Sequence, residues 1–140
     1  MKKWIIGVLI FIATVSIGCF KKNDEQAVKN VIIGNIEAMN REDIKWYMST
    51  IYDDGTDNYD SLEVMLTDIF AKFSIEIEIL SIEIVEIGDD VAKARAKTST
   101  KVDGNYPNKN SKATSVHYLV KDNGVWKIQS TINEEVKYFD

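Results

Sequence analysis

Two side chains in this sequence could carry catalytic or covalent chemistry, because each is the only one of its type: Cys19 and His117. With one thiol, the chain forms no internal disulfide and no structural zinc site built on several thiolates. His117 titrates near neutral pH, so it could supply acid–base catalysis. A strand histidine without a partner at a characteristic spacing is more often structural. The sequence leaves both roles open for His117.

A run of aspartates in the polar segment 52–60 is a third candidate group. Its members are Asp53, Asp54, Asp57 and Asp60. Carboxylates are the ligands that Ca²⁺ prefers, but the spacing differs from that of an EF-hand, so a solvated loop is expected and no metal site is assigned. The sequence also contains no Gly-rich phosphate loop, nucleophile elbow or set of metal ligands. No cofactor is therefore predicted.

The net charge and the length of the chain exclude further classes of protein. The chain has 17 Lys and Arg against 22 Asp and Glu, a net charge of −5, so it has no basic surplus to neutralise phosphates and nucleic acid is not an expected partner. Its 140 residues fit one domain. Its 14 aromatic residues and its many Ile and Val residues argue against disorder.

The start of the chain has the pattern of a secretory signal. Lys2 and Lys3 are followed by an apolar stretch over 4–17, then by Gly18 and by charged residues after Cys19. The stretch is shorter than the ~20 apolar residues that a spanning helix needs, which favours a processed signal over a permanent membrane helix.

The residues Ser16-Ile17-Gly18-Cys19 resemble the lipobox of bacterial lipoproteins, although Ser16 departs from the usual Leu. The resemblance implies cleavage between Gly18 and Cys19 and attachment of a diacylglycerol to the Cys19 sulfur. Two acyl chains anchor a protein stably where one does so only marginally. The alternative is an ordinary free cysteine beside a signal. We expect a lipid-anchored protein on the extracytoplasmic face of the cell membrane.

The resulting organisation has three parts: a lipoprotein signal peptide over 1–18, a lipidated tether over 19–23 and a folded domain over 24–140. Apolar residues at helical spacing predict helices over 23–40, 42–51 and 61–72. Asn23, Asn40 and Asp60 are the expected N-caps, because their side chains can accept hydrogen bonds from first-turn N–H groups.

Alternating apolar and polar residues then predict four strands, over 74–87, 91–102, 113–120 and 125–132. The alternation slips at Leu80, where we expect a β-bulge rather than two strands, because no Gly, Pro or Asn lies nearby. Segment 103–112 is a predicted loop, and segment 133–140 has too little pattern for a prediction.

The second strand has two distinct faces. Its small face, formed by Ala92, Ala94 and Ala96, allows either close helix packing or a cavity. Its basic face is expected to pair with acidic residues of the first strand. The residues concerned are Lys93, Arg95 and Lys97 on one strand and Glu76, Glu78 and Glu83 on the other.

Helices followed by hairpin-linked strands predict an α+β fold, with N-terminal helices packed on a curved antiparallel sheet. The ordered motifs resemble the nuclear transport factor 2-like (NTF2-like, SnoaL-like) superfamily over 24–132. They are Asn40-Arg41-Glu42-Asp43-Ile44, Tyr52-Asp53-Asp54, Gly88-Asp89-Asp90 and Gly124-Val125-Trp126-Lys127-Ile128. The resemblance implies a cystatin-like cone with a pocket at one end, and a homodimer formed through the outer face of the sheet.

This superfamily hosts several functions, so the fold alone does not decide among them. One hypothesis is a non-catalytic binding domain for a small apolar ligand or a protein partner. A second is an isomerase-like or dehydratase-like enzyme that uses His117 and a carboxylate brought near it. A third is a structural dimerisation module. The surroundings of His117 distinguish the first two.

Overall fold

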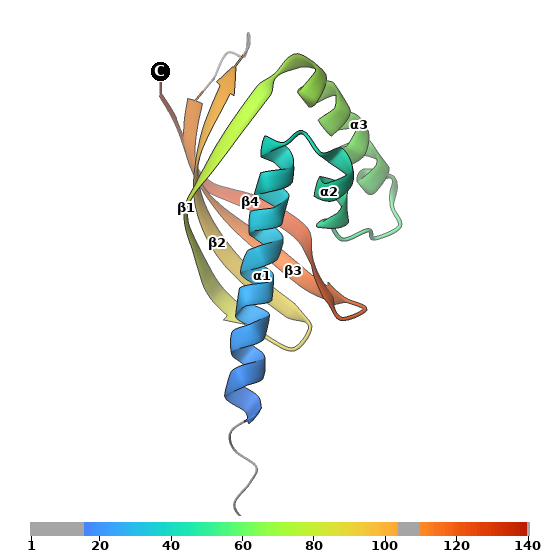
Figure 1. The fold of residues 1–140 in the computed structure, drawn as a ribbon, viewed down its shortest axis with the longest axis vertical. Helices are drawn as coiled ribbons and strands as arrows, with labels where there is room; N and C mark the ends of the chain where they lie inside the picture. Colours follow the sequence, from blue (N-terminus) through green and yellow to red (C-terminus); the bar gives the residue numbers. More distant parts are fainter. Residues whose placement is uncertain (1–15, 104–109, 140) are drawn as a thin grey trace, which may run out of the picture.

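The computed structural model describes residues 16–103 and 110–139. Three helices precede four strands in the order α1 Ser16–Asn40, α2 Ile44–Ser49, α3 Asp57–Lys72, β1 Ser74–Ile87, β2 Val91–Asp103, β3 Asn110–Asp122 and β4 Val125–Phe139. The helices lie on one side of a curved sheet, and α1 runs across its concave face (Figure 1). The predicted α+β architecture is confirmed.

The expected signal peptide lies almost entirely outside the described residues. At Gly18 and Cys19 the structure gives only the helical backbone of α1, which also continues through 19–23. Among the described residues, none of the helices combines the length and the apolar character that crossing a membrane requires.

The strands form one antiparallel sheet of consecutive hairpins, in the order β1-β2-β3-β4. β1 is a single strand with a register shift between Ile79 and Ser81, which confirms the predicted bulge at Leu80. A second shift, between Ile84 and Glu86, was not predicted. Because bulges bend a strand and increase its twist, the two shifts account for the curvature of this edge of the sheet.

The predicted helix starts were wrong. α1 begins at Ser16, so Asn23 lies within the helix instead of capping it. α3 begins at Asp57, so Asp60 lies in its first turn, where a carboxylate is favourable beside the positive end of the helix.

The cap of α2 is Asp43 rather than Asn40, and its carboxylate accepts a hydrogen bond from the Trp46 N–H at 2.9 Å. Asn40 has another role, at the edge of the sheet. Its amide donates to the Ile77 carbonyl at 2.9 Å and accepts from the Ile77 N–H at 2.7 Å. It therefore occupies backbone groups that the edge strand β1 would otherwise leave open.

The two C-terminal strands are longer than predicted. β3 begins at Asn110, within the expected loop, and β4 continues to Phe139, where the sequence predicted no element. The rest of the expected loop, 104–109, lies outside the described residues. Two register shifts in the β3–β4 pairing break the alternation of β4, which explains why its second half lacks a strand pattern.

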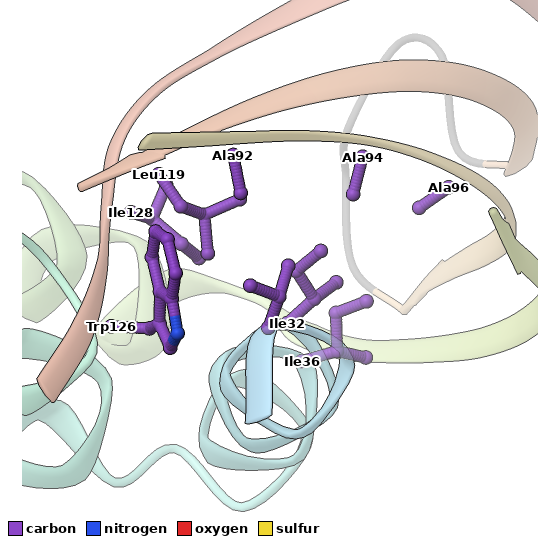
Figure 2. Packing of buried hydrophobic residues seen from close by; sticks show 9 residues of the cluster. Ile32, Ile36, Ala92, Ala94, Ala96, Leu119, Trp126 and Ile128 are labelled. Atoms are coloured by element: carbon purple, nitrogen blue, oxygen red, sulfur yellow. The ribbon is translucent and has the colours of Figure 1, made fainter. Parts of the chain in front are cut away.

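The core forms where α1 meets the concave face. Ile32 and Ile36 project from α1 toward Ala92, Ala94 and Ala96 of β2 (Figure 2). Leu119, Trp126 and Ile128 complete this side of the cluster, together with Val28. The alanines therefore permit close helix packing, which was one of the two predicted alternatives. Burying one isoleucine side chain contributes about 1.5–3 kcal/mol.

Asp24 joins the first part of α1 to the β3–β4 hairpin. Its carboxylate accepts hydrogen bonds from Lys121 Nζ at 3.1 Å and from Trp126 Nε1 at 3.2 Å. These bonds, led by that of Trp126, lower the pKa of Asp24. Lys121 also lies 4.8 Å from the centroid of the Trp126 ring. The polar edge of the indole is thus satisfied while its ring stays in the core.

The charged outer face matches the predicted pairing in part. Arg95 lies opposite Glu83, with an N–O distance of 3.9 Å, and also binds Glu134 of β4 at 2.9 Å. Lys93 lies opposite Glu86, which was not among the predicted partners. The remaining predicted pairs were wrong, because the register places Glu76 opposite Lys101, Glu78 opposite Ser99 and Lys97 opposite Ser81.

Candidate functional site

His117 lies on the inner face of the sheet, which the sequence could not decide. It is opposite Ala94 of the core and only 8% exposed. Leu119, two residues further along β3, belongs to the core. Ser115, two residues earlier, is also buried. The histidine therefore marks the place where the apolar part of the inner face gives way to a polar part.

Two side-chain pairs link β3 to β4 at this place. His117 Nδ1 lies 2.9 Å from the Thr131 Oγ1, and the Ser115 hydroxyl donates to Asn133 Oδ1 at 2.7 Å. We call Ser115, His117, Thr131 and Asn133 the inner-face cluster. Its β3 members are buried, whereas Thr131 and Asn133 are exposed. A ligand can therefore reach the cluster from the side of β4.

The inner-face cluster depends on the irregular pairing of β4. Leu119 pairs with Ile128, but the preceding residue of β3 pairs with Ser130, so Gln129 is an extra residue. This bulge reverses the alternation, placing Thr131 inside and Ile132 outside. Glu134 is a second extra residue. Strict alternation from Trp126 and Ile128 would instead point Ile132 inward, which is why the sequence missed Thr131 and Asn133.

Burial lowers the pKa of His117 to about 4. The imidazole is therefore neutral at pH 7, so that one of its nitrogens is a hydrogen-bond donor and the other an acceptor. Among the described residues no carboxylate hydrogen bonds to it. Acid–base catalysis of the predicted kind needs such a carboxylate nearby, so this geometry suits hydrogen bonding to an uncharged group better than proton transfer.

A second buried polar group lies between α1 and the segment after α2. The Asn35 amide donates to Thr50 Oγ1 at 2.8 Å, and Thr50 in turn donates to the Tyr47 carbonyl at 2.6 Å. Burial raises the pKa of Tyr47, partly offset by its hydrogen bond with Asn35. The signal in the sequence was Asn35 itself, a polar residue within the apolar face of a helix. This group fastens the α2 segment to α1.

Of the four candidate aspartates, Asp57 and Asp60 lie in the first turn of α3, while Asp53 and Asp54 shape the loop before it. Asp53 accepts a hydrogen bond from the Gly55 N–H at 2.8 Å, and Asp54 accepts two from Thr56, at 3.0 and 2.6 Å. In the described part of the chain, no group of three or more His, Cys, Asp or Glu side chains is arranged to hold a metal ion. The loop is thus organised by turn hydrogen bonds.

A curved antiparallel sheet wrapped around an N-terminal helix defines the class of small cone-shaped α+β domains. Within this class, residues 30–139 match the family model described as "Anti-sigma-I factor RsgI9, C-terminal domain". The match spans most of the chain, and the chain belongs to this family. No curated protein sequence matches it.

Solved structures share this fold. A proposed scytalone dehydratase from Novosphingobium aromaticivorans aligns with a TM-score of 0.72 at 12% identity, covering 89% of this chain and 93% of that one. A proposed dehydratase of the NTF2-like family from Streptomyces avermitilis gives 0.68 at 14% identity, covering 79% and 94%. A cystatin-like protein of unknown function from Nostoc punctiforme gives 0.67 at 15%, covering 82% and 92%. At these identities the likeness shows the fold, and the expected NTF2-like, cystatin-like cone is confirmed.

Proposed function

We propose that the chain is a lipoprotein anchored at the extracytoplasmic face of the cell membrane, whose cone-shaped domain binds an uncharged small ligand without catalysis. The observation that carries the binding role is His117, buried on the inner face, kept neutral and hydrogen bonded to Thr131 rather than to an acid. A neutral imidazole without an acidic partner can orient a ligand but is poorly equipped for proton transfer.

The side chains of the inner face indicate which class of ligand the domain would bind. The inner-face cluster contributes hydroxyl, amide and neutral imidazole groups, and Val136 and Tyr138, which face inward further along β4, expose apolar surface on the same face. An anionic ligand would need a cationic side chain, and a cationic ligand a carboxylate, to offset the cost of desolvation. The cluster supplies neither. A largely apolar ligand with one or two neutral polar groups fits best.

The family name refers to a domain of an anti-sigma-I factor, and a protein named for the factor it opposes is compatible with a protein partner. A protein partner is therefore the second candidate occupant, as the sequence suggested. The anchor rests on the sequence: the basic start, the apolar stretch and Gly18 directly before Cys19.

A binding screen tests the ligand. Uncharged, anionic and cationic small molecules are compared for their effect on the melting temperature of the protein. We expect uncharged compounds to stabilise it, and Thr131→Val to abolish the shift by removing a hydroxyl from the inner-face cluster. Ser130→Ala is the matched control, because Ser130 pairs with Tyr118 and faces outward. Hits that are all charged, or that persist in Thr131→Val, would refute the proposal.

Metabolic labelling with an alkyne-bearing fatty acid tests the anchor. The unchanged chain should carry the label and sediment with membranes, whereas Cys19→Ser should lose both properties. Thr14→Ala, a change within the apolar stretch, is the control and should behave like the unchanged chain. A Cys19→Ser protein that keeps the label would rule out lipidation at this residue.

A further inference from the structure

The two edges of the sheet differ in how well they are protected. β1 presents four exposed glutamates, and Asn40 occupies the backbone groups of Ile77. The glutamates are Glu76, Glu78, Glu83 and Glu86. A second β1 strand placed beside this edge would bring like charges together, which is a common way of preventing edge-to-edge pairing.

The other edge is β4, and only its first part is covered. Ile128 exchanges backbone hydrogen bonds of 2.8 Å with Thr50 and Tyr52. Beyond Ile128, no segment in the described part of the chain pairs with the free side of β4. Residues 131–139 therefore present alternate N–H and C=O groups to solvent, which is a template for another strand.

This open part of β4 also exposes large apolar side chains, which are unusual on a strand edge that stays in contact with water. Ile132 is 56% exposed, Val136 37%, Tyr138 61% and Phe139 40%. They lie on both faces of one short stretch of strand, so burying them calls for an extended partner rather than a helix or a flat surface.

We propose that residues 132–139 of β4 pair antiparallel with the same segment of a second copy of this chain. The sequence of the segment is complementary to itself. Ile132 and Phe139 face outward, as do Glu135 and Lys137, whereas Asn133, Val136 and Tyr138 face inward. A two-fold axis at Val136 then places Val136 opposite itself and Glu135 opposite Lys137 of the partner subunit.

The same register also gives suitable partners to the other residues of the segment. Ile132 meets Phe139 of the partner subunit on the outer side, and Asn133 meets Tyr138 of the partner subunit on the inner side. Glu134, the bulged residue, stays outside the pairing in both copies and keeps its bond to Arg95. Every pair joins residues of one face, as antiparallel strands require.

This dimer differs from one formed through the outer face of the sheet, and it does not depend on the lipid or the ligand. It joins two four-stranded sheets edge to edge into one continuous sheet. It also brings Tyr138 of the partner subunit beside Asn133, so that each copy extends the inner-face cluster of the other.

Disulfide cross-linking of the full chain in membranes tests the register. Residues directly opposite in antiparallel strands have Cα atoms about 4.5–5.5 Å apart, within the range that a disulfide accepts. Val136→Cys should form a covalent dimer on mild oxidation. Val125→Cys, an exposed position of the same strand outside the proposed interface, and the unchanged chain with Cys19 alone are the controls and should not.

Two further experiments test the same register without relying on the Val136→Cys cross-link alone. Co-expressed Ile132→Cys and Phe139→Cys chains should cross-link to each other and not to themselves. In the Val136→Cys background, Glu135→Lys should reduce dimer yield about tenfold through two like-charge contacts. Adding Lys137→Glu should restore it.

A monomeric Val136→Cys protein would overturn the proposal. Equal cross-linking of Val125→Cys would also overturn it, because the contact would then be non-specific. A cross-link to a protein of another size would show that the edge takes a different partner.

Discussion

His117 should make the stability of this protein depend on pH in a way that follows from its burial. The ordinary pKa of 6.5 falls to about 4 in the folded chain. Above pH 6.5 the imidazole is neutral in the folded and unfolded states alike. As the pH falls from 6.5 toward 4, the unfolded chain takes up a proton that the folded chain refuses, so folding loses stability. Below the folded-state pKa both states are protonated and the loss is complete.

The size of the effect follows from the same two pKa values. Between pH 7 and pH 5 the free energy of unfolding should fall by about 2 kcal/mol through His117 alone. Urea unfolding followed by tryptophan fluorescence measures it. His117→Asn, whose amide stays neutral and can still reach Thr131, should lack this loss. Carboxylates titrate in both proteins, and their contribution cancels in the difference.

Equal losses for the unchanged chain and His117→Asn between pH 7 and pH 5 would refute the reasoning. An NMR titration provides a check that does not depend on the variant. Because the sequence has one histidine, its imidazole protons are assigned without ambiguity. Half-protonation should occur near pH 4, and a midpoint near the ordinary value would show that the ring is solvated.

Four further substitutions, one of them a surface control, probe the packing, and each is measured by urea unfolding at pH 7. Ile32→Ala, at a side chain with 0% exposure, should cost about 2–5 kcal/mol, whereas Val64→Ala, at 70%, should change stability by less than about 0.5 kcal/mol. Gly34→Ala should stabilise the protein by about 1 kcal/mol, since the added Cβ would lie 3.5 Å from the Trp46 ring, an ordinary contact. Asn40→Ala should cost about 1–2 kcal/mol by leaving backbone groups of β1 without partners. Equal costs at Ile32 and Val64, a destabilised Gly34→Ala or an unaffected Asn40→Ala would contradict the packing described.

The order of elements and the fold class could be predicted because their signals are local. Helical spacing changes to strict alternation after Phe73, and Gly88 and the pair Asn123-Gly124 mark the hairpin turns. Even the bulge at Leu80 was visible, because the residues on both sides alternate cleanly and only the phase changes.

The wrong predictions concern segments where a local sequence motif is overridden by contacts with distant parts of the chain. Asn23 has the spacing of a capping residue, yet the helix continues through it to Ser16. In β4 the bulges at Gln129 and Glu134 interrupt an alternation too short to reveal its phase. For the same reason only part of the candidate site was predicted. His117 stands out by its residue type, but Thr131 and Asn133 join it in the inner-face cluster only through the pairing of two strands.

The bulge at Gln129 gives β4 one residue more than regular pairing with β3 needs. Deleting Gln129 would leave Ile128 opposite Leu119 and Ser130 opposite Tyr118, so Thr131 and Asn133 would still face inward and the strand would lose only the local bend and twist of the bulge. The length of β4 can therefore change by one residue at this point without changing which side chains line the inner face. Substitution of Thr131 or Asn133, rather than a change of length at Gln129, is the route by which the polarity of this face would change.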